Sequence, residues 1–82
     1  MRIVIVEDEQ PARDKLRAAL LCAAPVAQIV AELSGVAETI AWLSRNPKPD
    51  LMFLDIQLSD GLCFEILRGA PVRFPVIFAR LR

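Results

Sequence analysis

The order of hydrophobic and polar positions along the chain predicts strands that alternate with helices. Residues 3–6 and 51–54 are unbroken apolar runs, and such runs are typical of strands buried on both faces of a parallel sheet. The segment 28–33 mixes polar with apolar residues, which favours a strand near the edge of the sheet. A fourth strand begins at Pro75-Val76-Ile77-Phe78.

Apolar residues spaced three and four positions apart predict helices between these strands. Pro11 suits the first turn of the first helix, where its missing N–H costs nothing. The apolar stripe of this helix consists of Ala12, Leu16, Ala19, Leu20 and Ala23. The stripe of the second helix, which Ser34 can cap, consists of Val36, Ile40 and Leu43. A short third helix covers 62–67, after a turn at 59–61 in which Asp60 serves the turn and binds no metal.

Strands and helices that alternate at this spacing predict βαβ units and therefore a parallel sheet with helices on its faces. The fold class is α/β, with a doubly wound parallel sheet. A chain of 82 residues forms one domain at most. No linker, internal repeat or low-complexity segment indicates a second domain.

Composition excludes several function classes. The chain has no His and two Cys, which excludes a His-based catalytic triad and the usual zinc sites. Its 10 basic and 10 acidic residues balance, so we expect no direct binding of nucleic acid. The apolar runs are too short to cross a membrane, and no secretory leader is visible. We therefore expect a cytoplasmic protein without a membrane partner.

Acidic residues follow two of the buried strands. Glu7 and Asp8 come after the first strand, and Asp55 comes after the third. Ligands of doubly wound sheets bind beyond the carboxyl ends of the strands, so these carboxylates converge if the two strands are neighbours. Like charges this close need a cation or a raised pKa, and an all-oxygen cluster suits Mg²⁺. Each acid alone could be a solvated loop residue, but three at this position favour a functional site.

At these residues the sequence resembles the receiver domain of bacterial two-component response regulators. The matching segments are 4–9, 11–13, 49–56 and 55–61, the last followed by Phe64-Glu65-Ile66. The run from Asp55 onward is similar to receivers that carry a LytTR-type DNA-binding domain. The resemblance covers residue 1 to about Phe78 and implies a flavodoxin-like fold, here with about four strands in the order 2-1-3-4 and three helices.

The resemblance also implies the roles of the acidic residues. It makes Asp55 the phosphoacceptor, which takes a phosphoryl group from a sensor histidine kinase. Glu7, Asp8 and Asp55 bind Mg²⁺, with the backbone carbonyl of Gln57 as a further ligand. The implied function is Mg²⁺-dependent phosphoryl acceptance in two-component signalling, by a phosphoprotein that is not an enzyme.

The end of the sequence departs from the family pattern. Receivers have five βα units, a Ser or Thr after strand four where Arg80 stands here, and a Lys and an aromatic residue on strand five. We therefore expect residues 1–82 to form a receiver domain truncated at its C-terminus, without an output domain and with impaired phosphorylation. The bare edge of the fourth strand predicts self-association.

Three alternatives remain open at this point. Arg80 either contacts the acidic residues or the phosphoryl group, or belongs to a solvated tail. The whole chain could be a Mg²⁺-dependent phosphohydrolase with Asp55 as nucleophile, although Gln57 stands where a general acid is needed. It could also be a receiver fragment that does not signal.

Overall fold

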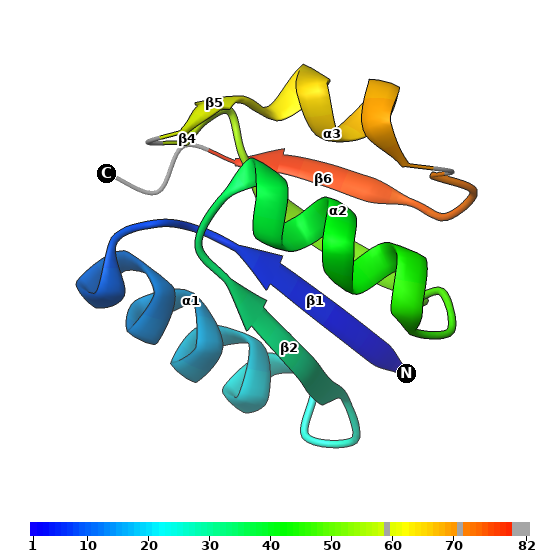
Figure 1. Cartoon of the computed structure of the whole chain (residues 1–82). Helices are drawn as coiled ribbons and strands as arrows, with labels where there is room; N and C mark the ends of the chain where they lie inside the picture. Colours follow the sequence, from blue (N-terminus) through cyan, green and yellow to red (C-terminus); the bar gives the residue numbers. More distant parts are fainter. Residues whose placement is uncertain (59, 71, 80–82) are drawn as a thin grey trace.

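Strands and helices alternate along the chain as the hydrophobic pattern predicts. The structure, a computed structural model, describes residues 1–58, 60–70 and 72–79. Its elements in chain order are β1 (Arg2–Val6), α1 (Gln10–Ala23), β2 (Gln28–Leu33), α2 (Val36–Arg45), β3 (Leu51–Asp55), β4 (Gln57–Leu58), β5 (Gly61–Leu62), α3 (Cys63–Gly69) and β6 (Val76–Ala79) (Figure 1). Among the described helices, none is both long and apolar enough to cross a bilayer.

Four strands form one parallel sheet in the order β2-β1-β3-β6. This order confirms the α/β class and the predicted sequence of neighbours, in which β6 is the fourth strand. Ile3, Val4, Ile5 and Val6 of β1 are at most 2% exposed. Such complete burial explains why this strand reads as an unbroken apolar run, since neither of its faces meets water.

The helices cover both faces of the sheet. The core on the face of α2 and α3 consists of Val4, Val6, Leu33, Val36, Met52, Leu54, Leu58 and Ile66. On the other face, Ile3 and Ile5 pack with Leu16 and Leu20 of α1. Successive side chains of a strand point to opposite faces, and for this reason β1 contributes alternate residues to the two cores.

The predicted stripe of α1 is only partly correct. Ala12 is buried and Leu16 and Leu20 are half-buried, whereas Ala19 and Ala23 are exposed. Of the three described helices, only α1 packs on its side of the sheet. Because no described helix lies beside α1 there, only the narrow row of α1 side chains that faces the sheet is covered. The remainder of the apolar stripe faces solvent.

A short hairpin follows β3 and was not predicted. Gln57 pairs with Leu62 and Leu58 pairs with Gly61 in antiparallel register. Gly61 has a φ of 151°, a backbone conformation that residues with a Cβ rarely adopt. Of the turn expected at 59–61, Ser59 lies outside the described residues, and Asp60 and Gly61 belong to this hairpin, whose strands are too short to show a hydrophobic period.

The predicted cap of α2 is wrong. Ser34 lies one residue too early, because Gly35 is the N-cap, and the Ser34 hydroxyl instead donates to Glu38 Oε2 at 2.8 Å. The amides of Val36 and Ala37 donate to the Asp60 carboxylate at 2.8 and 3.2 Å. These two hydrogen bonds, Val36 foremost, lower the pKa of Asp60 below its usual value of 3.8.

Replacement of Ile66 is expected to detach α3 from the sheet. Its side chain is fully buried, and Ile66→Ala should lower the free energy of unfolding by about 2–5 kcal/mol, measured by urea denaturation. Ile66→Val should cost about 0.5–1.5 kcal/mol, which keeps the measurement possible if the Ala variant unfolds. Leu67→Ala, at a site 36% exposed, is the control, and an equal loss there would contradict this account of α3.

Acid is expected to weaken the cap of α2. The pKa of Asp60 is lower in the folded chain than in the unfolded chain, so its stabilising effect is complete above the unfolded pKa and is lost as the pH falls through the folded pKa. The free energy of unfolding should therefore decrease below about pH 4, and decrease less steeply in Asp60→Asn. Equal pH slopes in urea denaturation of the two proteins would refute this role of Asp60.

Candidate functional site

Three carboxylates meet at the carboxyl edge of the sheet. Glu7 and Asp8 follow the last residue of β1, and Asp55 is the last residue of β3. Val6 pairs with Leu54, which brings the next residue of each strand to the same level. Carboxylate oxygens of Glu7, Asp8 and Asp55 lie within 4.8 Å of one another. We call these three residues the acid cluster, and the structure brings them together as the sequence predicts.

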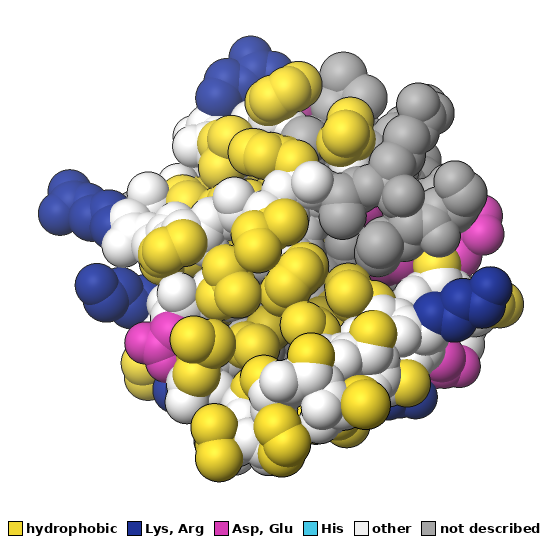
Figure 2. Space-filling model, turned by 180° about the vertical axis from the view of Figure 1, so that it is seen from behind, with side chains coloured by type: hydrophobic (Ala, Val, Ile, Leu, Met, Phe, Trp, Pro, Cys, Tyr) yellow, Lys and Arg dark blue, Asp and Glu magenta, His cyan; other side chains and the backbone are white. Residues whose placement is uncertain are grey.

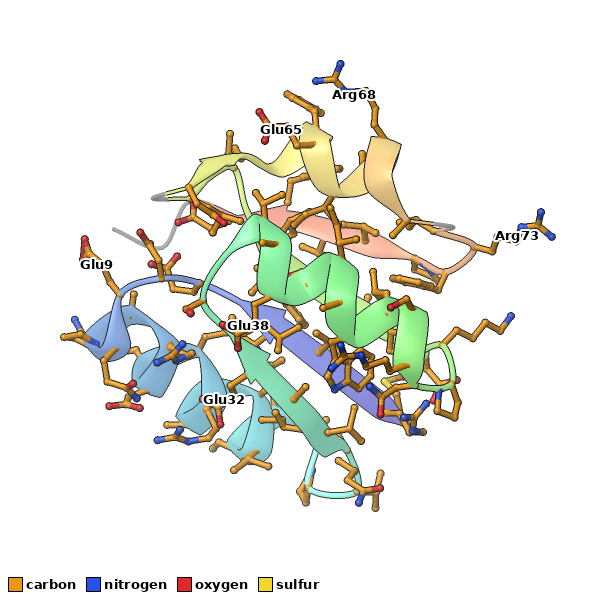
Figure 3. The ribbon with its side chains drawn as sticks, in the orientation of Figure 1. Glu9, Glu32, Glu38, Glu65, Arg68 and Arg73 are labelled. Atoms are coloured by element: carbon orange, nitrogen blue, oxygen red, sulfur yellow. The ribbon has the colours of Figure 1, made fainter. Side chains whose placement is uncertain are left out.

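Three hydrogen bonds fix Glu7, two through its backbone and one through its side chain. Its N–H donates to the Leu33 carbonyl of β2 at 2.9 Å, and its own carbonyl accepts from Arg13 Nη1 of α1 at 3.2 Å. Glu7 Oε1 accepts from the N–H of Glu9 at 3.0 Å. Glu9 marks this end of the molecule in Figure 3. These contacts fix the turn from β1 into α1 and hence the direction of the Glu7 side chain.

Two members of the acid cluster are buried. Glu7 is 0% exposed and Asp55 is 3% exposed, whereas Asp8 is half-buried. Burial of a carboxylate costs free energy, and nearby like charges add to that cost. A solvated loop acid would not bear this cost, so the burial favours the functional reading of the acid cluster over the solvated one.

Two cationic side chains of α1 contact Glu32 of β2, and one of them, Arg13, also reaches the backbone carbonyl of Glu7. Arg17 Nη1 lies 2.9 Å from Glu32 Oε1, and Arg13 Nε lies 3.9 Å from the same atom. Hydrogen bonding to Glu32 raises the pKa of Arg17. The sequence did not reveal the contact of Arg13 with the Glu7 carbonyl, because no side-chain pattern reveals a bond to the backbone.

The donor set of the acid cluster fits a small divalent cation. Mg²⁺ binds oxygen at about 2.0–2.1 Å in octahedral geometry, so ligand oxygens on opposite sides of the ion are about 4 Å apart. The spacing of the three carboxylates, within 4.8 Å, is close to that value. Only oxygen ligands are offered, which suits Mg²⁺ better than softer metals.

Gln57 and Arg80 were also predicted at the site. Gln57 begins β4, two residues after Asp55, so its carbonyl belongs to the segment that leaves the acid cluster. Arg80 lies outside the described residues, and its predicted contact with the acidic residues stays a prediction. Asp60, which was expected to serve a turn, accepts hydrogen bonds from the first-turn amides of α2.

Sequence comparison finds relatives among response regulators. The chain is 42% identical over 66 residues to the sensory transduction protein LytT of Bacillus anthracis, a match that covers 80% of the chain and 26% of the relative. It is 47% identical over 58 residues to an uncharacterized response regulatory protein of Yersinia pestis, covering 71% and 24%. The chain thus spans about a quarter of the length of these relatives. No family model matches it.

Solved structures show the same fold. The receiver (REC) domain of the PhyR response regulator from Erythrobacter litoralis matches 94% of the chain and 60% of its own length, with a TM-score of 0.70 and 27% identity. A mutant of the response regulator MaeR bound to sulfate matches 99% of the chain and 67% of its own length, with a TM-score of 0.82. At 23% identity, the MaeR match concerns the fold alone. By sequence relationship and by fold, the chain belongs with the receiver domains of response regulators.

Proposed function

We propose that Asp55 accepts a phosphoryl group from the phosphohistidine of a sensor histidine kinase. The observation that supports this most is the acid cluster, in which carboxylates from the ends of β1 and β3 lie within 4.8 Å of one another. It occurs in a chain with a receiver fold and with response regulators among its relatives. The kinase as partner and the phosphoryl transfer both belong to this proposal.

The chemical step is a displacement at phosphorus. A carboxylate oxygen of Asp55 attacks the phosphoryl group, and an acyl phosphate forms. The P–N bond breaks, and its electron pair returns to the imidazole nitrogen, which takes up a proton. Asp55 ends a buried strand and is itself 3% exposed, so the sheet fixes the attacking oxygen and limits the water around it.

Glu7, Asp8 and Asp55, with the backbone carbonyl of Gln57, are the residues proposed to bind Mg²⁺. When bound, Mg²⁺ offsets the negative charge of the transferring phosphoryl oxygens, which is most of the catalysis that such a transfer needs. The N–H of Glu9 donates to Glu7 Oε1 and so orients the Glu7 side chain. The chain's own contribution is therefore to hold its oxygens at a fixed spacing.

The proposed role is that of a signal acceptor. Phosphorylation replaces one negative charge at Asp55 with about two, and the charge change can bias a neighbouring segment. The names of the relatives, a sensory transduction protein and a response regulatory protein, support signalling over enzymatic turnover. We propose that the chain acts in the cytoplasm and does not itself bind nucleic acid.

We also propose that the chain self-associates through β6. This strand lies at one end of the four-stranded sheet, and Ile77 and Phe78 are 44% and 45% exposed. Phe53 and Ile77 are paired neighbours on the sheet face of α1. The view from behind in Figure 2 shows many hydrophobic side chains gathered over one face of the molecule.

The two edges of the sheet differ in how they resist pairing. On β2, Glu32 carries a charge that bridges to Arg17, and the register with β1 shifts between Ile3 and Val4. Charges and bulges on an edge strand discourage added strands. The described part of β6 contains only apolar residues, and its pairing with β3 has no register shift. A second copy of the chain, which offers the same apolar strand, is the proposed occupant of this edge.

Phosphorylation is expected at Asp55 with a small-molecule donor. Incubation with Mg²⁺ and acetyl phosphate should give an acid-stable, hydroxylamine-labile adduct, which peptide mass spectrometry locates. Asp55→Asn or removal of Mg²⁺ by a chelator should reduce the adduct to background. Asp50→Asn is the matched control, because Asp50 lies at the opposite end of β3, where its Oδ2 accepts from the Arg2 N–H at 2.7 Å. The fraction of the chain that carries the adduct at saturation measures how complete phosphorylation is, and a low fraction would indicate the impairment expected from the sequence.

Other outcomes of this experiment would contradict the proposal. Release of phosphate with repeated turnover would favour the phosphohydrolase. Neither adduct nor release, in a chain that remains folded, would favour a receiver fragment that does not signal.

Self-association is expected to depend on the apolar edge of β6. Sedimentation should show a mass that rises with concentration, and Ile77→Lys should weaken association by about tenfold or more, because a buried charge at an edge opposes pairing. Leu21→Lys is the matched control, since Leu21 is 45% exposed but lies on α1. A stable monomer at every concentration would rule out this role of β6.

A further inference from the structure

The segment that carries Gln57 is attached to α2 through Asp60, which is not one of the proposed metal ligands. We propose that Asp60 is a positioning residue of the phosphoacceptor site and that it acts by fixing the described residues 56–58 and 60–61 against the N-terminus of α2. The proposal rests on the proposed function, because it concerns the Gln57 carbonyl as a ligand of Mg²⁺. Asp60 itself is not a ligand in this account.

The described part of the segment is held at two points after Asp55. Leu58 is 5% exposed and packs in the core with Val36 and Ile66. Asp60 then reaches α2, 24 and 23 residues back along the chain. Gln57 lies between Asp55 and these two points, so the position of its backbone depends on them.

The contact of Asp60 with α2 is a charged cap. The amides of Val36 and Ala37 donate to Oδ1 and Oδ2 at 2.8 and 3.2 Å. Amides of a helix's first turn have no partner within the helix, and a carboxylate there also interacts favourably with the helix dipole. Hydrogen bonds to an ionised carboxylate are stronger than neutral ones. The same two bonds depress the pKa of Asp60, so the carboxylate stays charged at neutral pH.

The space at Gly35 also shows how close the Asp60 carboxylate lies to the start of α2. A Cβ at Gly35 would lie 2.8 Å from Asp60 Oδ1, which is nearer than real Cβ atoms come to other heavy atoms, and 3.0 Å from Oδ2, which is a tight contact. A side chain at position 35 would push the carboxylate away from the amides. The residue before α2 is therefore matched to the carboxylate that caps it.

The hairpin needs such a tether because it is too small to hold its own position. β4 and β5 pair through two residues each, and an isolated two-stranded hairpin is at best marginally stable in water. A carbonyl that moved with a loose hairpin would have to be ordered whenever the cation bound, and that ordering would reduce affinity. Because Asp60 orders the hairpin before the cation binds, this loss of affinity is avoided. Because coupling is reciprocal, binding at the site should also strengthen the cap of α2.

The test compares two carboxylates that each accept from backbone N–H groups, Asp60 from two amides of α2 and Asp50 from the N–H of Arg2. Asp60→Ala should weaken Mg²⁺ binding, measured by calorimetric titration, by about tenfold, which is the effect typical of residues that orient metal ligands. Asp60→Asn retains an acceptor oxygen and should recover part of the affinity. Asp50→Ala removes the acceptor of the Arg2 N–H far from the acid cluster and should change affinity by less than about twofold.

Hydrogen exchange gives a second readout that does not need the metal. In the metal-free chain, Asp60→Ala should speed exchange at the amides of 56–58, 60–62 and the first turn of α2, and Asp50→Ala should not. In the wild type, Mg²⁺ should slow exchange at Val36 and Ala37.

The outcomes separate the two proposals. If the wild type binds Mg²⁺ and Asp60→Ala binds it equally well, the positioning role is overturned and the proposed function stands. If the wild type binds no Mg²⁺, the metal part of the proposed function fails, and unchanged exchange at 56–58 in Asp60→Ala then overturns the tether as well. Equal effects of Asp60→Ala and Asp50→Ala on affinity would indicate a general loss of stability and would also reject the positioning role.

Discussion

The parallel pairing of β1 with β3 at the middle of the sheet is the constraint on which the other features depend. Both strands are apolar runs that need cover on two faces, and α1 on one side and α2 with α3 on the other supply it. Parallel strands end at the same edge, and the pairing of Val6 with Leu54 sets their level. The acid cluster at that edge thus follows from the burial of apolar residues far from it.

The local pattern was sufficient for the sheet and its helices, but contacts between distant residues were not predictable. Continuous and periodic apolar positions located the strands and helices, and the resemblance to receivers supplied their order. Ser34 looked like the cap of α2 because capping is usually local. The observed cap is Asp60, 24 residues away in sequence. The β4–β5 hairpin, with two residues in each strand, is too short for a hydrophobic period to repeat and so to be recognised in the sequence.

The candidate site also has a part that the sequence predicted and a part that it did not. Glu7, Asp8 and Asp55 were predictable, because each follows directly from its place at the end of a strand. The residues that hold the site in shape were not, since Arg13 and Asp60 act on backbone groups, the Glu7 carbonyl and the α2 amides. A backbone donor or acceptor leaves no mark on the sequence, so its partner is visible only once the chain is folded.

The burial of the acid cluster implies that the site and the stability of the fold are linked. Glu7 and Asp55 are almost fully buried and lie within 4.8 Å of Asp8, so their mutual repulsion and lost hydration oppose folding. The unfolded chain separates these charges and hydrates them. A cation that binds only the folded arrangement therefore stabilises the fold by mass action. The feature that makes the edge of the sheet costly for the protein alone, three carboxylates held close together, is the same feature on which the proposed cation binding rests.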